Sequence, residues 1–170
     1  SAAAAGGFTT LLVNPKTRPV LDDPALVREL ANRAPGQTDV EILPIGALTK
    51  GLGGQELAEM GLMAQAGAVA FSNAGVQVPN TATLRFALLY ARPFGVPVMV
   101  RAGDASLEEH GSMHEGDVSN AIGLRGLPSA AEEIGVARLI ALSRGTGAPV
   151  HISGVTTWKS VDQIRAAKAE

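Results

Sequence analysis

Five short apolar runs, separated by helical patterns, constrain the fold of this chain more than any other feature. The runs show little alternation between polar and apolar residues, which is typical of parallel strands that are covered on both faces. They are the segments 8–13, 40–45, 68–72, 96–100 and 149–153. We therefore predict five buried parallel strands.

Helical patterns lie between these runs, with local signals at several of their starts. Asp23 precedes Pro24 as an N-cap, Ser129 and Glu132 have capping-box spacing, and Thr157 can cap the last segment. The opening "SAAAAGG" resembles the last turns of a helix. The expected helices cover residues 24–34, 54–67, 81–95, 129–147 and 157–170.

Strand and helix alternate with a period of roughly 30 residues, which predicts right-handed βαβ units around a parallel sheet. The chain has 170 residues, enough for a substantial core. A helix at each end suggests an arc of a larger α/β fold, and a (β/α)8 TIM barrel of about 250 residues fits this pattern. We therefore expect residues 1–170 to be a fragment of a single barrel domain.

Composition excludes several classes of function. The net charge is −2 and the basic residues are scattered, so we expect neither nucleic acid nor a membrane as a partner. Cysteine is absent, which excludes disulfides and thiolate metal sites. No apolar run approaches the roughly 20 residues of a membrane span, and the first residues lack the features of a signal peptide. These observations predict a cytoplasmic protein.

The carboxyl ends of the predicted strands, where α/β enzymes place their chemistry, are poor in reactive groups. They contain no histidine and one carboxylate, Asp104. His110 and His114 have a spacing that could bind zinc on a helix, but the neighbouring glycines favour a solvated loop. His151 lies among apolar neighbours, which predicts a core histidine. The "KGLGG" loop at 50–54 matches no phosphate-binding motif and is interpreted as a flexible loop.

Basic residues at two strand ends offer a second possibility. Lys16, Arg18 and Arg101 could together bind a small anion if the strand ends converge, and ordinary surface charge is the alternative interpretation. Between the fourth strand and its helix lies a long glycine-containing excursion, residues 102–128. Loops of that length are usually functional or bind a partner.

Six stretches, in order along nearly the whole chain, resemble the dihydroorotase family of the amidohydrolase superfamily. They include "LPIGALTKGLGGQELAEM", "AGAVAFSNAG", "FGVPVMVRAGD" and "HISGVTTWKSVDQIRAAKAE". The resemblance implies that the chain holds roughly strands two to six of the barrel. It also implies a family chemistry in which zinc polarises an amide and activates water, so that carbamoyl-aspartate and dihydroorotate interconvert.

The resemblance further implies that the functional positions of the family are degenerate here. The substrate-binding asparagine of the family corresponds to Lys16, and two carboxylates of its "FSDDG" motif correspond to Asn73 and Ala74. Two histidine ligands of the family correspond to Arg101 and Gly154. We therefore expect no catalytic residue and no metal site in this chain, although the family's first histidine pair and its catalytic aspartate lie outside it.

Three functions remain open at this point. The first is a non-catalytic dihydroorotase homologue, a pseudoenzyme of pyrimidine biosynthesis that acts as an assembly partner of aspartate transcarbamoylase. The second is an active cyclic amidohydrolase whose remaining site residues lie elsewhere, or one that works without metal through Lys16, Arg101 or Asp104. The third is a small-anion binding protein. Open sheet edges in such an arc also predict self-association.

Overall fold

A computed structural model describes residues 2–33 and 39–170 of the chain. The contacts divide it into two compact units, each of which is described by itself. The first unit comprises Ser1–Val100 with Thr146–His151, and the second comprises Arg101–Gly145 with Ile152–Glu170. Strands β4 and β7 carry the chain from one unit to the other.

The predicted strands are confirmed, and they form one five-stranded sheet. Its order is β1-β2-β3-β4-β7. The strands are β1 (Thr10–Val13), β2 (Glu41–Ala47), β3 (Ala70–Ser72), β4 (Val98–Arg101) and β7 (Val150–Ser153). The pairs from β1 to β4 are parallel, with Leu12 opposite Leu43 and Phe71 opposite Val98. The sheet order follows the chain order, as expected when short βαβ connections place sequential strands next to each other.

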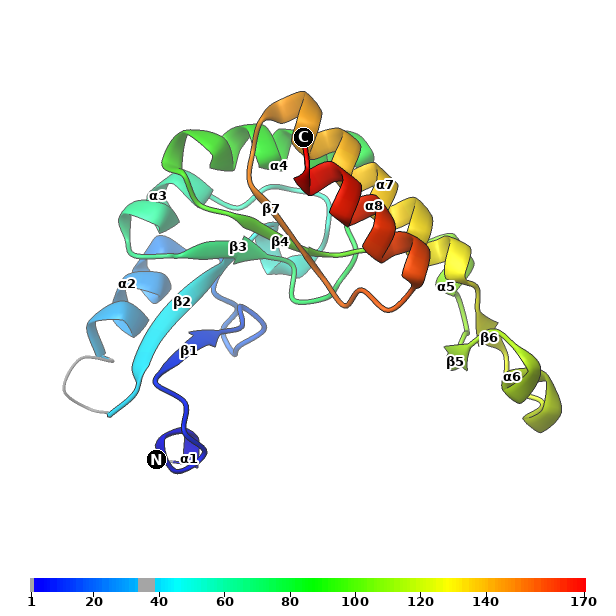
Figure 1. Ribbon diagram of the computed structural model, residues 1–170. Helices are drawn as coiled ribbons and strands as arrows, with labels where there is room; N and C mark the ends of the chain where they lie inside the picture. Colours follow the sequence, from blue (N-terminus) through cyan, green and yellow to red (C-terminus); the bar gives the residue numbers. More distant parts are fainter. Residues whose placement is uncertain (1, 34–38) are drawn as a thin grey trace. The chain divides into compact units, whose positions relative to one another are not determined.

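The helices of the first unit fill the connections between these strands. They are α1 (Ala2–Ala5), α2 (Pro24–Arg33), α3 (Met60–Gln65) and α4 (Thr81–Ala91), with the short 3-10 helices η1 (Lys50–Leu52) and η2 (Arg92–Phe94). Helices α2, α3 and α4 pack side by side in chain order (Figure 1). The predicted cap before α2 is confirmed, because the Asp23 carboxylate accepts a hydrogen bond from the Ala25 amide at 2.7 Å. Residue 34, the predicted end of that helix, lies outside the described residues.

The helix predicted over 54–67 is shorter than expected and begins only at Met60. The preceding residues turn back toward the end of β2 instead. Thr49 and Leu57 form an antiparallel bridge, and the Lys50 amide donates to the Glu56 carbonyl at 2.9 Å. These tertiary hydrogen bonds replace the helical ones that the local pattern predicted.

The core of the first unit surrounds Phe71, which is fully buried at the centre of the sheet. Gly46 on the neighbouring strand makes this possible, because a Cβ there would lie 2.9 Å from the Phe71 ring. The sheet, the helices and their connections contribute further fully buried side chains to this unit. They include Leu48, Met60, Met63, Leu84, Leu88 and Val98.

The second unit contains the excursion, which has more regular structure than the loop that the sequence predicted. It forms α5 (Ala105–Glu108), β5 (Met113–His114), α6 (Asp117–Ile122) and β6 (Gly126–Leu127). Strands β5 and β6 pair in parallel as a separate two-stranded sheet. The excursion is therefore a small structured element rather than an irregular loop.

Two long helices, α7 (Ser129–Thr146) and α8 (Trp158–Lys168), make up the rest of the second unit. They lie side by side and run parallel (Figure 1). Two ion pairs show this arrangement: Glu133 pairs with Lys159 near the starts of the helices, and Arg144 pairs with Glu170 near their ends. Parallel neighbouring helices are expected of consecutive βα units. No helix in the described part of the chain is long and apolar enough to cross a membrane.

The two caps predicted for these helices have different outcomes. The Thr157 cap of α8 is confirmed, since its hydroxyl accepts from the Ser160 amide at 3.3 Å. The capping box predicted for Ser129 and Glu132 is wrong. Ser129 already belongs to α7, and the Glu132 carboxylate bonds instead to the segment before α8.

Two glycines of α7 provide a test of the packing in the second unit. A Cβ at Gly135 would lie 2.2 Å from the Gly103 backbone nitrogen, whereas a Cβ at Gly145 would meet nothing within 4 Å. We expect Gly135→Ala to lower the free energy of unfolding of the full-length protein by about 2 kcal/mol or more, because backbone must move. Gly145→Ala, the matched control, should raise it by up to about 1 kcal/mol through helix propensity. Urea unfolding measures both, and equal effects would contradict this packing.

Candidate functional site

An ion pair between Arg101 and Glu108 occupies the carboxyl end of β4. The two guanidinium nitrogens Nη1 and Nη2 donate to the two carboxylate oxygens at 2.7 and 2.9 Å. Arg101 is the last residue of β4, and Glu108 is the last residue of α5. The ion pair therefore links the two ends of the segment that runs from β4 through α5. The Glu108 side chain is only 17% exposed. Bidentate pairing of this kind is strong and fixes the orientation of both groups.

Gly154 lies beside this ion pair, at the end of β7. A Cβ at Gly154 would be 4.0 Å from Arg101 Cγ, and the backbone there has a positive φ of 73°. The structure therefore brings together the two positions of the second unit at which the sequence predicts lost histidine ligands. The aliphatic part of Arg101 runs past the place from which a side chain at 154 would project.

Glu132 of α7 binds the segment that follows Gly154. Its carboxylate accepts from the Thr156 amide at 2.9 Å, the Thr157 amide at 2.9 Å and the Thr157 hydroxyl at 3.0 Å. It also accepts from the Thr156 hydroxyl at 2.5 Å. Burial alone would raise the pKa of Glu132, but these hydrogen bonds outweigh burial and lower the pKa to about 2.

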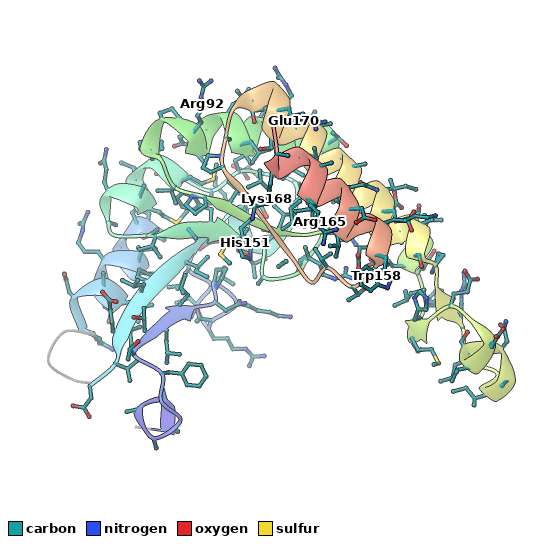
Figure 2. All side chains as sticks on the ribbon, viewed as in Figure 1. Arg92, His151, Trp158, Arg165, Lys168 and Glu170 are labelled. Carbon is teal, nitrogen blue, oxygen red and sulfur yellow. The ribbon has the colours of Figure 1, made fainter. Side chains whose placement is uncertain are left out.

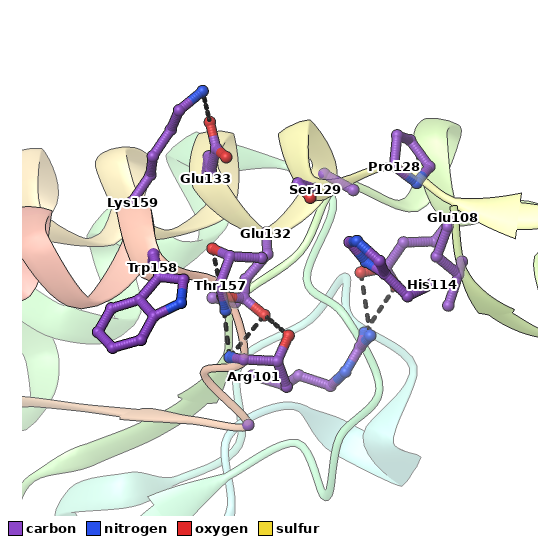
Figure 3. Close-up of a pocket in the computed structure, with 15 residues that line it drawn as sticks. Arg101, Glu108, His114, Pro128, Ser129, Glu132, Glu133, Thr157, Trp158 and Lys159 are labelled. Carbon is purple, nitrogen blue, oxygen red and sulfur yellow. Dashed lines mark hydrogen bonds and ion pairs between the residues drawn. The ribbon is translucent and has the colours of Figure 1, made fainter. Parts of the chain in front are cut away.

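A cavity of about 820 Å³ opens among these groups, and all of its lining residues belong to the second unit (Figure 3). Its three carboxylates are each engaged with groups of the chain itself. Glu108 is paired with Arg101, Glu132 with the two threonines, and Glu133 with Lys159 at 3.7 Å. His114 and Trp158 also line the cavity, and Trp158 is 83% exposed at the first turn of α8 (Figure 2). Each carboxylate of this cavity is therefore already engaged by another group of the second unit.

The remaining candidate residues lie in the first unit, where Asn73 follows β3. Asn73 is 3% exposed, and its Oδ1 accepts from the Thr49 hydroxyl at 2.7 Å. Its Nδ2 donates to the Leu52 carbonyl at 3.3 Å, and the Thr49 hydroxyl accepts in turn from the Gly54 amide at 2.9 Å. Both ends of the Asn73 amide are thus used to hold the loop after β2 against the end of β3.

Ala74 and the basic residues after β1 take no part in that network. Ala74 has a positive φ of 54°, a conformation that favours glycine, asparagine or aspartate over alanine. Lys16 and Arg18 are exposed in the segment after β1. The proposed anion-binding set is therefore divided, because Arg101 belongs to the second unit and is ion-paired with Glu108.

The other titratable candidates have structural or exposed positions. Asp104 caps α5, and the hydrogen bond from the Ser106 hydroxyl lowers the pKa of that carboxyl. His110 follows α5 with a positive φ of 64°, whereas His114 is in β5, so the two are not on one helix. His151 is exposed on β7 (Figure 2), and the prediction of a core histidine is wrong. In the "KGLGG" loop, the Gly51 amide donates to Asp22 at 2.7 Å.

Zinc, the metal that the family resemblance implies, does not fit the residues at the four family positions Asn73, Ala74, Arg101 and Gly154. Zinc sites use thiolate, imidazole or carboxylate ligands. This chain offers a buried amide already bonded at both ends, a methyl group, an ion-paired guanidinium and a glycine. Within residues 2–33 and 39–170, no three His, Cys, Asp or Glu side chains are grouped so that they could hold a metal ion.

Solved structures with the same fold include hydantoinases. The chain superposes on an L-hydantoinase (dihydropyrimidinase) from Arthrobacter aurescens with a TM-score of 0.77 and 21% identity, covering 99% of this chain and 39% of the other. A D-hydantoinase (dihydropyrimidinase) from Thermus sp. gives 0.68 and 22%, covering 99% and 38%. The chain therefore has the fold of part of a (β/α)8 barrel, which confirms the predicted fold class.

Sequence comparison identifies the family. The sequence profile described as dihydro-orotase-like matches residues 1–160. The chain is 45% identical over 166 residues to a dihydroorotase of Caldicellulosiruptor saccharolyticus, and 48% identical over 169 residues to one of Pelotomaculum thermopropionicum. The alignments cover 98% and 99% of the chain, but in both cases only 39% of the relative's length. The chain belongs to the dihydro-orotase-like family.

Sequence reasoning missed the residues that engage the candidate positions. Arg101, Gly154 and Asn73 were identified through the family resemblance, but Glu108, Thr49 and the contacts of Glu132 were not. Thr49 is 24 residues from Asn73, and Glu132 is 24 residues from Thr156, so no local pattern reports these contacts. Glu108 lies only seven residues after Arg101, and an acidic residue so close to an arginine was the one available signal.

We expect Glu132→Gln to destabilise the full-length protein in a pH-dependent way. The folded pKa of about 2 lies below the ordinary value of 4.5, so the stabilisation is fully present above pH 4.5 and is lost as the pH falls toward 2. Allowing for solvent screening of this half-buried group, we expect the variant to have a free energy of unfolding about 1–2 kcal/mol lower than wild type at neutral pH. Urea unfolding at several pH values measures it.

Glu133→Gln is the matched control for this variant. Glu133 is the next residue and forms one ion pair, with an exposed lysine at 3.7 Å. Its replacement should change the free energy of unfolding by less than about 0.5 kcal/mol. A difference between wild type and Glu132→Gln that stays constant from neutral pH down to pH 2 would contradict the role given to Glu132.

We expect Asn73→Asp to destabilise the protein although it returns a carboxylate to the family position. A carboxylate cannot donate to the Leu52 carbonyl, and it would carry a charge into a site that is 3% exposed. The expected loss in free energy of unfolding is about 2 kcal/mol at neutral pH. Asn14→Asp, at an exposed position whose Oδ1 accepts from the Lys16 amide, is the control and should be nearly neutral. If both variants were as stable as wild type, the Asn73 amide would have no structural role.

Proposed function

We propose that the full-length protein is a non-catalytic dihydroorotase homologue of pyrimidine biosynthesis, which acts as an assembly partner of aspartate transcarbamoylase. The observation that carries the proposal is the Arg101–Glu108 ion pair. It places a guanidinium, which carries no free lone pair for a metal ion, at a position where the family resemblance implies a zinc ligand.

The other family positions support the same proposal. Asn73 is bonded at both ends within the first unit, Ala74 offers only a methyl group, and Gly154 has no side chain. Lys16 stands where the resemblance implies a substrate-binding asparagine. These replacements leave a folded scaffold with its glycines and caps, which is expected if the surface of the protein rather than its chemistry is used.

An active zinc-dependent dihydroorotase is the second candidate, and one specific observation favours it. The relatives that are 45% and 48% identical to this chain both carry the name dihydroorotase. In this alternative, the parts of the protein outside this chain supply the metal ligands. A small-anion binding protein is weaker, because Glu108 already neutralises Arg101.

The experiment combines an activity assay with a binding assay on the full-length protein. We expect no dihydroorotate hydrolysis and no carbamoyl-aspartate cyclisation with zinc supplied. We also expect co-elution with the aspartate transcarbamoylase of the same organism at micromolar concentrations, and lower transcarbamoylase activity when the partner is withheld. Zinc-dependent turnover would overturn the non-catalytic proposal, and independent elution would overturn the assembly role.

Arg101→Ala tests the part of Arg101 under each of the two candidate functions. If the protein is non-catalytic, this variant should remain inactive and should still bind the transcarbamoylase. If the wild-type protein turns over dihydroorotate and Arg101→Ala does so equally well, Arg101 has no part in that reaction.

A further inference from the structure

Residues 109–127, which we call the excursion module, are hydrogen-bonded mainly to one another. The Ser112 amide donates to the Arg125 carbonyl at 3.0 Å where β5 and β6 begin, and α6 is bonded internally. Among the described residues, one hydrogen bond leads out of the module, from the Gly111 amide to the Glu108 carbonyl at 3.1 Å. The module is therefore a self-contained part of the second unit.

The excursion module has almost no core of its own. Ser119 is its single buried residue, whereas Val118, Ile122 and Leu124 are 64%, 58% and 48% exposed. A segment with so few buried apolar side chains opens at a much smaller cost in free energy than the global unfolding of the protein. We therefore expect the module to open while the rest of the second unit stays folded.

Close contacts inside the module make it move as one piece. A Cβ at Gly126 would lie 2.4 Å from Glu115 Cα, and a Cβ at Gly111 would lie 2.3 Å from the Leu127 side chain. The two short strands therefore touch through their backbones. The chain enters the module after α5 and leaves it just before α7, and motion of the whole module needs changes of the backbone angles only at these two connections.

Glu108 stands where the chain enters the module, and Arg101 of β4 binds its carboxylate with both Nη atoms. A bidentate pair fixes the orientation of both groups, so this pair also fixes the direction in which the chain enters the module. The Glu108 side chain is only 17% exposed, and solvent therefore screens the pair only in part. Loss of the pair would release the first of the two connections.

The module also forms one wall of the cavity in the second unit. His114 and Leu127 of the module line this cavity. Glu132 and Trp158, which come from α7 and α8, line it away from His114 (Figure 3). If the module moved away as one piece, the cavity would lose the wall that His114 and Leu127 form. The module therefore has the position of a lid.

We propose that the excursion module is a lid on this cavity and that the Arg101–Glu108 ion pair is the latch that holds the lid closed. In the closed state, the Glu108 carboxylate occupies the guanidinium of Arg101, which also lines the cavity. Arg101 can bind the carboxylate of a ligand only after the latch opens, so the pair is an autoinhibitory contact. This inference goes beyond the proposed function and applies to a catalytic or a non-catalytic protein.

Hydrogen exchange of the full-length protein, followed by mass spectrometry, tests the lid and the latch. After correction for intrinsic rates, the bonded amides of the module should exchange at least about a hundredfold faster than those of α7 around Val136, which is fully buried. Glu108→Ala should accelerate exchange in the module about tenfold and leave α7 unchanged. Glu109→Ala is the matched control, because Glu109 is exposed and pairs with the adjacent His110. It should change exchange in the module less than about twofold.

Tryptic cleavage of the wild-type protein covers the case in which Glu108→Ala fails to fold. Arg125 is the only Lys or Arg between Arg101 and Arg138, so cleavage after Arg125 reports opening of the module. We expect this cleavage under native conditions, with α7 left intact. Module amides that are as protected as those of α7 overturn the lid. Exchange in Glu108→Ala that is unchanged, or that rises equally in the module and α7, overturns the latch. These readouts are independent of turnover and of transcarbamoylase binding.

Discussion

The Arg101–Glu108 ion pair determines both the structure and the chemistry at the carboxyl end of β4. It joins the end of β4 to the end of α5, and both of its residues line the cavity in the second unit. Removing Arg101 would take the bidentate partner from a carboxylate that is only 17% exposed, which costs more than the pair itself contributes. The pair therefore stabilises the excursion, and it cannot act as a metal ligand while it does so.

The same principle applies to the other polar groups near the strand ends. Glu132 is a carboxylate with a strongly lowered pKa, a feature often associated with catalysis. Here the hydrogen bonds that lower it come from the segment before α8, and they fix that segment to α7. Asn73 likewise binds a loop rather than a ligand. Groups that an enzyme would keep available are used in this chain to hold the β/α connections.

The sequence alone was sufficient to predict the strands and the helix caps that depend on neighbouring residues. Apolar runs located all five strands of the sheet, and Asp23 and Thr157 were identified from residues two or three positions away. Features that depend on distant residues were either not predicted or predicted wrongly. Helix α3 begins at Met60 because the preceding residues pair with the end of β2, where Thr49 forms a bridge with Leu57. The Glu132 carboxylate accepts a hydrogen bond from the Thr156 amide and not from the first turn of its own helix. Family resemblance located the candidate positions, but only the structure shows which side chains engage them.

Zinc content of the full-length protein shows whether the replaced ligand positions have abolished the metal site. The protein should be purified with zinc supplied, passed through mild chelation and gel filtration, and analysed for metal by elemental analysis. The account predicts far less than one zinc per chain, because the positions available in this part of the barrel offer an amide, a methyl group, a guanidinium and a glycine. Retention of about one zinc or more per chain would contradict it, and dihydroorotate hydrolysis would then become the leading function.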